Sequence, residues 1–169
     1  MDARTESEPT RMKNPTSVER KSDREIVITR TFNASAHLVW EAWTKADLFK
    51  RWWVPKSFPI TMTSCEMDVR VGGTYRLMMV VNGDTSKPMP FFGKYLEVTP
   101  SSRLVWTNEE AGDAGAITTV TFEEKGGKTL VVMSELYPSK EALDAEIGSG
   151  AKDCMGETFD QLSETLGAS

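Results

Sequence analysis

The chain is poor in the residues on which metal sites, disulfide frameworks and imidazole catalysis depend. Its 169 residues include two cysteines and one histidine. Cys65 and Cys154 lie far apart and form no C-x-x-C pair, so the sequence supports neither a zinc site nor a disulfide framework. We therefore predict no metal and no cofactor. Reduced thiols are typical of a cytoplasmic protein, which is the location we expect.

The single histidine limits the catalytic chemistry that the sequence can suggest. His37 lies at the predicted start of a helix, where we expect it to be exposed. No nucleophile or orienting carboxylate accompanies it in the sequence, so nothing indicates a catalytic triad or an imidazole acid–base pair.

Long apolar runs and a surplus of basic residues are also missing. No apolar stretch approaches the roughly 20 residues of a membrane helix, and the N-terminus has no secretory signal. The formal net charge is −5 and the pI is near 5.0, which argues against broad binding to nucleic acid or anionic membranes. A local basic patch is compatible with this composition. We expect a soluble protein that neither spans a membrane nor binds nucleic acid.

Apolar and aromatic residues, in contrast, are sufficient for one sizeable core. Hydrophobic residues make up 39% of the chain, with five tryptophans, three tyrosines and seven phenylalanines. Residues 1–24 carry charges of both signs, two prolines and few apolar residues, which predicts a disordered polar tail. Residues 25–169 are expected to form a single domain.

The first half of that domain predicts one strand followed by two short helices. Residues 25–32 are rich in β-branched side chains, which favour a strand. Apolar residues then recur at helical spacing from residue 36 and again over residues 45–53. Pro55 and Pro59 end any helix in this segment.

Between residues 62 and 135, strand patterns alternate with turn signals and predict six strands. The short connections favour antiparallel pairing in a curved meander, because a parallel crossover needs a dozen or more residues. Gly72-Gly73 precedes a strand and belongs to no phosphate-binding motif, so we interpret it as a turn.

The last 30 or so residues return to helical periodicity, with a break at Gly148 and Gly150. Beyond the break, residues 151–166 would form a helix roughly 24 Å long. Its apolar stripe consists of Met155, Phe159, Leu162 and Leu166. Strands first and a helix last predict an α+β fold.

Several short motifs occur in one order along the chain: Trp40-x-x-Trp43-Thr44, Arg51-Trp52-Trp53-x-Pro55, Arg70-x-Gly72-Gly73-x-Tyr75, Gly93-Lys94-Tyr95 and Arg103-Leu104-Val105-Trp106. With them, residues 25–166 resemble the START-like helix-grip (SRPBCC) superfamily, in the branch of the activator of the heat-shock protein 90 ATPase. The resemblance implies a curved antiparallel sheet of about six or seven strands wrapped around a long C-terminal helix, with two short helices after the first strand. It also implies an apolar cavity between sheet and helix.

The predicted cavity is rich in aromatic and sulfur-containing side chains, which adapt to different ligands and offer polar handles. The alternative is that the same side chains simply fill the core. The predicted lining residues are Trp40, Met67, Tyr75, Leu77, Met79, Tyr95, Trp106, Val120, Phe122, Met155, Phe159 and Leu162.

Three functions from different classes fit these observations. The first is non-catalytic binding of a small apolar or amphipathic molecule in the cavity. The second is a cyclase- or hydrolase-like enzyme using Tyr75, Tyr95 or Glu66, although no catalytic motif supports it. The third, implied by the resemblance, is a protein-binding module that acts on a chaperone ATPase in a stress response.

Two further interpretations concern surfaces. The acidic residues on or near predicted strands could include an inward acid–base pair, but solvated strand faces are the simpler interpretation; they are Glu66, Asp68, Glu97, Glu109 and Glu135. We expect a monomer or a weak homodimer. A dimer could use a strand edge or Trp52-Trp53, although packing of these tryptophans against the sheet is the simpler interpretation.

Overall fold

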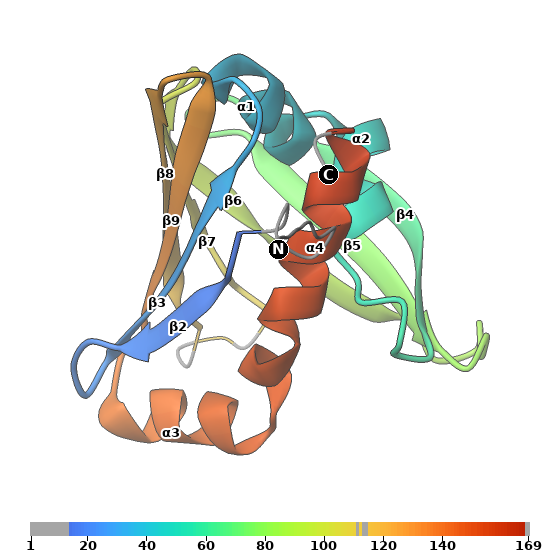
Figure 1. Cartoon of the computed structure of the whole chain (residues 1–169). Coiled ribbons are helices and arrows are strands. Elements are labelled where there is room, and N and C mark those ends of the chain that lie inside the picture. The colour runs from blue at the N-terminus through green and yellow to red at the C-terminus, as the bar shows by residue number, and fades with distance from the viewer. Residues whose placement is uncertain (1–13, 111, 113–114, 168–169) are drawn as a thin grey trace, which may run out of the picture.

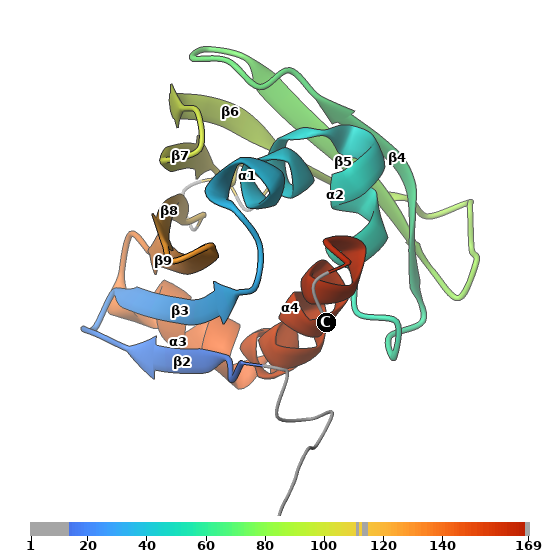
Figure 2. The same cartoon turned by 45° about the horizontal axis from the view of Figure 1, so that its top comes forward.

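The computed structural model describes residues 14–110, 112 and 115–167 (Figure 1). These residues form one antiparallel sheet of eight strands in the order β2-β3-β9-β8-β7-β6-β5-β4. The strands are β2 (Ser17–Arg20), β3 (Glu25–Phe32), β4 (Ile60–Met67), β5 (Thr74–Val81), β6 (Met89–Thr99), β7 (Arg103–Thr107), β8 (Ile117–Lys125) and β9 (Lys128–Leu136). The sheet curves around the helices (Figure 2), so the predicted α+β helix-grip fold is confirmed.

Strand β2 corrects the prediction of a disordered tail over residues 1–24. Ser17–Arg20 pairs antiparallel with β3, in the register Ser17↔Thr29 to Arg20↔Ile26. All four side chains of β2 are exposed, so no apolar pattern marked the strand. It forms because β3 otherwise presents a row of unpaired backbone groups at the sheet edge. The part of the predicted tail over residues 1–13 lies outside the described residues.

The predicted strand at residues 25–32 is β3, and the six-strand meander is β4 to β9. Side chains alternate between the two faces of each strand. Leu77 and Met79 of β5 are buried and Tyr75 is half-buried, while Val120 and Phe122 of β8 are buried, as the alternation predicted. The concave face of the sheet therefore carries the core.

One glycine in β6 permits a very close approach between strands. A Cβ atom added to Gly93 would lie 2.0 Å from the backbone oxygen of Thr107 in β7. Neither backbone can move far, because β6 pairs with β5 through Tyr75↔Gly93 and with β7 through Tyr95↔Trp106.

We predict that Gly93→Ala lowers the free energy of unfolding by about 2–3 kcal/mol, because the added methyl group overlaps backbone atoms. Urea denaturation of both proteins measures the loss. Gly156→Ala is the matched control, since a Cβ there meets no atom within 4 Å. The control should be neutral or slightly stabilising. Equal stability of Gly93→Ala and the parent would contradict the close approach.

Two short helices, α1 (Ala36–Thr44) and α2 (Ala46–Trp52), follow β3 as predicted and lie on the concave side of the sheet (Figure 2). Their tryptophans form the centre of the core, where the rings of Trp43 and Trp52 meet edge to face at 4.7 Å. Trp52 is fully buried, and its indole nitrogen donates to the backbone oxygen of Ala42 at 3.0 Å. Trp52 therefore packs in the core and cannot form part of an exposed dimer surface.

The C-terminal region contains α3 (Lys140–Gly148), a 3₁₀ turn η3 (Ala151–Cys154) and α4 (Met155–Thr165). The predicted break is present, and Gly150 has φ +78°. The α-helix beyond it is shorter than the predicted 151–166, because the first four residues after the glycine take the tighter 3₁₀ form. Met155, Phe159 and Leu162 of the predicted stripe are buried on α4, whereas Leu166 lies just past the helix end and is half-buried.

Polar side-chain contacts join α4 to the end of α2 on one side and to β3 on the other. Gln161 donates from Nε2 to the backbone oxygens of Trp52 (3.0 Å) and Val54 (2.8 Å), at the end of α2. On the other side, Nη1 of Arg30 in β3 lies 2.6 Å from Oδ1 of Asp160. The helix is thus fixed in orientation by polar contacts as well as by its apolar stripe.

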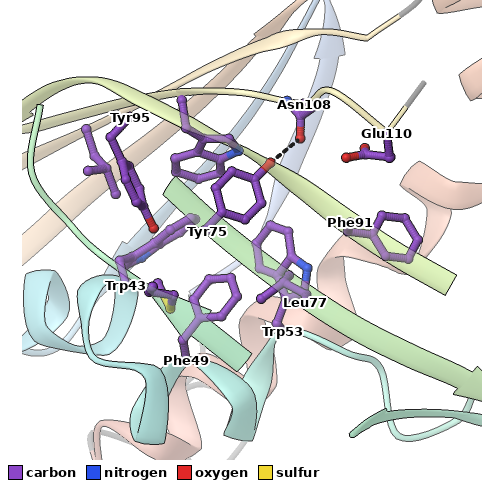
Figure 3. Close-up of a pocket in the computed structure, with 12 residues that line it drawn as sticks. Trp43, Phe49, Trp53, Tyr75, Leu77, Phe91, Tyr95, Asn108 and Glu110 are labelled. Atoms are coloured by element: carbon purple, nitrogen blue, oxygen red, sulfur yellow. Dashed lines mark hydrogen bonds between the residues drawn. The ribbon is translucent and has the colours of Figure 1, made fainter. Parts of the chain in front are cut away.

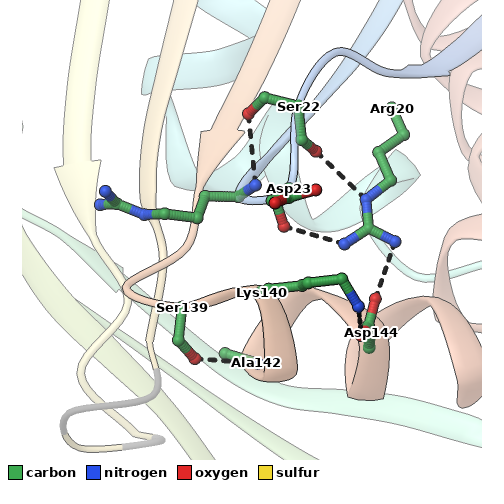
Figure 4. A network of polar contacts seen from close by, with 8 residues as sticks. Arg20, Ser22, Asp23, Ser139, Lys140, Ala142 and Asp144 are labelled. Carbon is green, nitrogen blue, oxygen red and sulfur yellow. Dashed lines mark hydrogen bonds and ion pairs between the residues drawn. The ribbon is translucent and has the colours of Figure 1, made fainter.

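A second polar network ties β2 to α3 on the surface (Figure 4). Arg20 Nη1 lies 2.8 Å from Asp144 Oδ1, and Lys140 Nζ lies 2.8 Å from Asp144 Oδ2. The hydrogen bond from Lys140 holds the pKa of the Asp144 carboxyl below its usual value. All three side chains are well exposed, so the network contributes little to stability.

In the described part of the chain, each helix is too short or too polar to cross a bilayer.

Candidate functional site: an aromatic cavity and an adjoining cleft

A cavity of about 60 Å³ lies between the β4–β7 half of the sheet and helices α1 and α2 (Figure 3). Seven of its twelve lining residues are aromatic, and they come from five different elements and the segment after α2. The lining residues are Trp43, Phe49, Trp53, Met67, Tyr75, Leu77, Phe91, Tyr95, Leu104, Trp106, Asn108 and Glu110.

The rings of the inner cavity support one another. The rings of Phe49 and Trp53 stack with their centroids 4.7 Å apart. The ring centroids of Tyr75 and Tyr95 are 5.8 Å apart, and those of Trp43 and Trp106 are 6.0 Å apart. Such contacts between rings hold each side chain in a defined orientation. The cavity is therefore a shaped space rather than a loosely packed region.

An outer cleft of about 350 Å³ adjoins the inner cavity, and Trp53, Phe91, Asn108 and Glu110 line both. Trp53 and Phe91 are only half-buried, so they lie at the boundary between cavity and surface. The remaining lining residues are Val54, Pro55, Phe58, Ile60, Met79, Gly115, Ala116, Glu135, Tyr137, Glu146 and Cys154.

The structure divides the twelve residues predicted for the cavity into three groups. Met67, Tyr75, Leu77, Tyr95 and Trp106 line the inner cavity, and Met79 lines the outer cleft. The others are buried in the core and line neither space: Trp40, Val120, Phe122, Met155, Phe159 and Leu162.

The residues of the third group line no cavity because α4 and α1 pack closely against the sheet where a cavity was expected. Phe159 of α4 meets Phe32 of β3 edge to face at 5.6 Å, and Trp40 meets Phe122 at 5.4 Å. The first contact fills the space between α4 and β3, and the second fills the space between α1 and β8. The inner cavity lies instead between helices α1 and α2 and strands β4–β7.

The prediction missed seven lining residues of the inner cavity: Trp43, Phe49, Trp53, Phe91, Leu104, Asn108 and Glu110. Three of these, Trp43, Trp53 and Leu104, belong to the motifs that carried the family resemblance, so those motifs were a usable signal. Asn108 and Glu110 follow the end of β7 in an irregular segment, where no sequence periodicity points into or out of the fold.

Hydrogen bonds fix two polar side chains that line the inner cavity, Tyr75 and Asn108. Tyr75 donates its hydroxyl hydrogen to the backbone oxygen of Thr107 at 2.7 Å. Asn108 donates from Nδ2 to the backbone oxygen of Ala116 at 2.8 Å and to Oγ1 of Thr118 at 2.9 Å. These contacts fix the polar groups that a bound molecule would meet.

Glu135 corrects the interpretation of the strand carboxylates as solvated. It is 7% exposed, and the hydroxyls of Thr118 and Tyr137 each lie 3.4 Å from its carboxylate oxygens. Its position on β9 turns it to the concave face of the sheet. Glu66, which the enzyme hypothesis placed in the cavity, is exposed on β4 and lines neither space.

The cavity phenols are neutral at physiological pH. Burial, with a smaller contribution from the Glu110 charge, raises the pKa of Tyr75 well above its ordinary value. Burial likewise raises the pKa of Tyr95. Both hydroxyls therefore remain protonated. Protonated hydroxyls cannot remove a proton from a ligand. Tyr75, whose hydrogen is donated to Thr107, can still accept a hydrogen bond from one.

His37 is exposed as expected, with its Nε2 3.3 Å from Oε2 of Glu41 one helical turn away. It lies outside the lining of both spaces. Over the described ranges, no group of three or more His, Cys, Asp or Glu side chains is arranged to hold a metal ion.

Cys65 gives a prediction about thiol chemistry. Burial raises the pKa of its thiol to about 11. In a Cys154→Ser variant at pH 8, we expect iodoacetamide to alkylate Cys65 about two-hundredfold more slowly than an unperturbed thiol of pKa about 8.5, because only the thiolate reacts. The rate should rise with pH up to about pH 11. Mass spectrometry of timed samples measures it; a plateau near pH 9 would contradict the burial effect.

The curved sheet, the helices on its concave face and the apolar cavity define a helix-grip protein of the START-like class. Within that class, the chain belongs to the family described as Activator of Hsp90 ATPase homolog 1-like protein, whose family model matches residues 33–167. The family resemblance drawn from the motifs is confirmed. No curated protein matches the chain.

Solved structures of low sequence identity share the fold. A protein from Rhodobacter sphaeroides superposes with a TM-score of 0.80 at 22% identity, over 90% of this chain and 98% of that one. A protein from Nitrosomonas europaea gives 0.76 at 24% identity, over 87% and 96%. The AHSA1-like protein from Aeromonas hydrophila gives 0.63 at 23% identity, over 84% and 92%.

Proposed function

We propose that this protein binds a small apolar or amphipathic molecule in the inner cavity and the outer cleft, without chemical conversion. The observation that carries the proposal is the aromatic lining of the inner cavity, which shares Trp53 and Phe91 with a larger cleft. Aromatic walls with a few fixed polar groups are typical of small-molecule sites.

The two volumes limit how a ligand would be placed. Small-molecule sites usually have volumes of about 300–1,000 Å³. The outer cleft, at about 350 Å³, falls in that range, whereas the inner cavity of about 60 Å³ holds only a small group. The ligand would therefore place most of its apolar surface in the cleft and insert one end among the aromatic rings.

The polar groups of the site favour binding over catalysis. Tyr75 and Tyr95 have raised pKa values and stay protonated, and Glu66 is on the outside. Asn108 is held by two hydrogen bonds that it donates. These groups can orient a ligand, and no two of them form a paired acid and base. The outer cleft is also lined by the carboxylates Glu110, Glu135 and Glu146.

Native mass spectrometry of protein purified from its own organism tests this proposal. Compared with the denatured mass of the same sample, we expect a discrete non-covalent adduct. The denatured mass excludes covalent modification as its source. A clean apo mass, together with no binding of added amphiphiles by calorimetry, would contradict the proposal.

A second candidate, favoured by the family match, is a co-chaperone-like module that acts on a chaperone ATPase. In this case the purified protein should change the ATP turnover of an Hsp90-type chaperone and co-purify with it. Unchanged turnover over a range of concentrations, without co-purification, would remove this candidate and leave the ligand proposal untouched.

A further inference from the structure

A second concave region lies beside the cleft, between α2 and the edge strand β4. It is an open groove of about 720 Å³, which we call the basic groove. Its lining residues are Lys50, Arg51, Val54, Pro55, Lys56, Phe58, Pro59, Ile60, Thr61, Met62, Asn82 and Gly83.

The charge of the basic groove is opposite to that of the whole chain. It is lined by three cations, Lys50, Arg51 and Lys56, and by no carboxylate, although the chain carries a net charge of −5. In the described part of the chain, Arg51 and Lys56 form no ion pair. Lys50 Nζ lies 3.8 Å from Oδ1 of Asp47, but both side chains are exposed, so that pair is weak.

Glu157, a carboxylate on α4 beside residues 56–57, is already engaged in hydrogen bonds. Glu157 accepts hydrogen bonds from the backbone nitrogen of Ser57, at 2.8 Å, and from its hydroxyl. Gln161 accepts from the backbone nitrogen of Lys56 at 2.8 Å. These contacts fix the backbone of residues 56–57 beside the groove, while Glu157 itself does not line it.

An apolar surface joins the basic groove to the ligand cleft. Val54, Pro55, Phe58 and Ile60 line both the groove and the cleft. Phe58 is 40% exposed. A molecule crossing this surface would cover Phe58, with one end in the cleft and the other among the three cations.

We propose that the ligand is an anionic amphiphile. Its carboxylate, sulfate or phosphate group is held by Lys50, Arg51 and Lys56, and its apolar part crosses Val54, Pro55, Phe58 and Ile60 into the cleft. This inference rests on the proposed function and adds the charge of the ligand to it. Attraction between a single anion and three cations at a partly exposed site explains a preference of about tenfold over an uncharged analogue.

The test compares four molecules with the same ten-carbon chain, each below its micelle-forming concentration: decanoate, decyl phosphate, decanol and decyltrimethylammonium. Calorimetry of the full chain should give affinities for the two anions about tenfold above decanol and further above the cation. Raising the salt concentration to 0.5 M should reduce the advantage of the anions and leave decanol unchanged.

Charge-removing variants locate the effect. In the triple variant Lys50→Gln, Arg51→Gln, Lys56→Gln, the anions should lose about tenfold in affinity while decanol keeps its own. The matched control Lys21→Gln, Lys125→Gln, Lys128→Gln removes the same charge from exposed positions away from the groove and should keep the preference. All six side chains are exposed, so both variants should fold.

The possible outcomes separate this inference from the proposed function. Equal affinity for all four molecules, or tighter binding of the cation, would overturn the anion site while the cleft remains a ligand site. A preference for anions that survives in the groove variant would also overturn it. Failure of all four to bind would count against the proposed function itself, and the anion site with it.

Discussion

Replacing Leu77 by tryptophan should lower the affinity for decanoate at least about tenfold while the protein stays folded. Leu77 is 3% exposed on β5 and lines the inner cavity, whose volume is about 60 Å³. The larger indole would occupy that space and exclude the end of the ligand. Overpacking of this kind typically costs about 1–3 kcal/mol in stability, which most domains tolerate. Calorimetric titration, with circular dichroism to confirm folding, measures the result.

Leu77→Met is the matched control, because it conserves volume and usually costs less than about 1.5 kcal/mol. It should bind decanoate within about threefold of the parent. Val120 is unsuitable for the same test: it is fully buried on β8 and does not line the cavity, so a larger side chain there would strain the core. Unchanged affinity in a folded Leu77→Trp variant would place the ligand elsewhere.

Asp160→Asn should lower the free energy of unfolding by about 2–3 kcal/mol. The Arg30 side chain is 2% exposed, and its Nη1 lies 2.6 Å from Asp160 Oδ1. Removing one partner of a fully buried ion pair costs about 3–5 kcal/mol, because the remaining charge is left in an apolar environment. The Asp160 side chain is 39% exposed, so water reaches this pair and the expected loss is smaller. Urea denaturation followed by circular dichroism measures it.

The double variant Arg30→Met, Asp160→Asn should recover part of this loss, since it removes the buried charge and leaves the methionine to pack against Phe32. Arg30 contacts the Phe32 ring face, with its guanidinium carbon 5.3 Å from the ring centroid. Asp144→Asn is the matched control: Asp144 is similarly exposed, but its partners Arg20 and Lys140 are on the surface (Figure 4). The control should lose much less stability. Equal losses for Asp160→Asn and Asp144→Asn would show that burial of Arg30 is unimportant.

Elements whose pattern is local could be predicted from the sequence. β3 has the bounds expected from its β-branched residues, and β4 to β9 lie between the predicted turns. The stripe of Met155, Phe159 and Leu162 is buried as its helical spacing required. These predictions succeeded because the period of side-chain direction is set by the element itself.

The position of the cavity needed the tertiary structure. Periodicity shows that the side chains of Phe122 and Phe159 face inward. It does not show whether another side chain packs against them or an empty space remains. In the fold, Trp40 contacts Phe122 and Phe32 contacts Phe159, whereas Tyr75 and Leu77 face a space that α1 and α2 leave open.

The sequence by itself determined the class of fold, the meander and the inward faces, because backbone propensity and side-chain alternation act over a few neighbouring residues. Only the tertiary structure decided that Ser17–Arg20 pairs at the edge of β3, that Glu135 is buried, and that Lys50, Arg51 and Lys56 border one groove. Each of these depends on contacts between segments far apart in the chain, and no local pattern records which segments will meet.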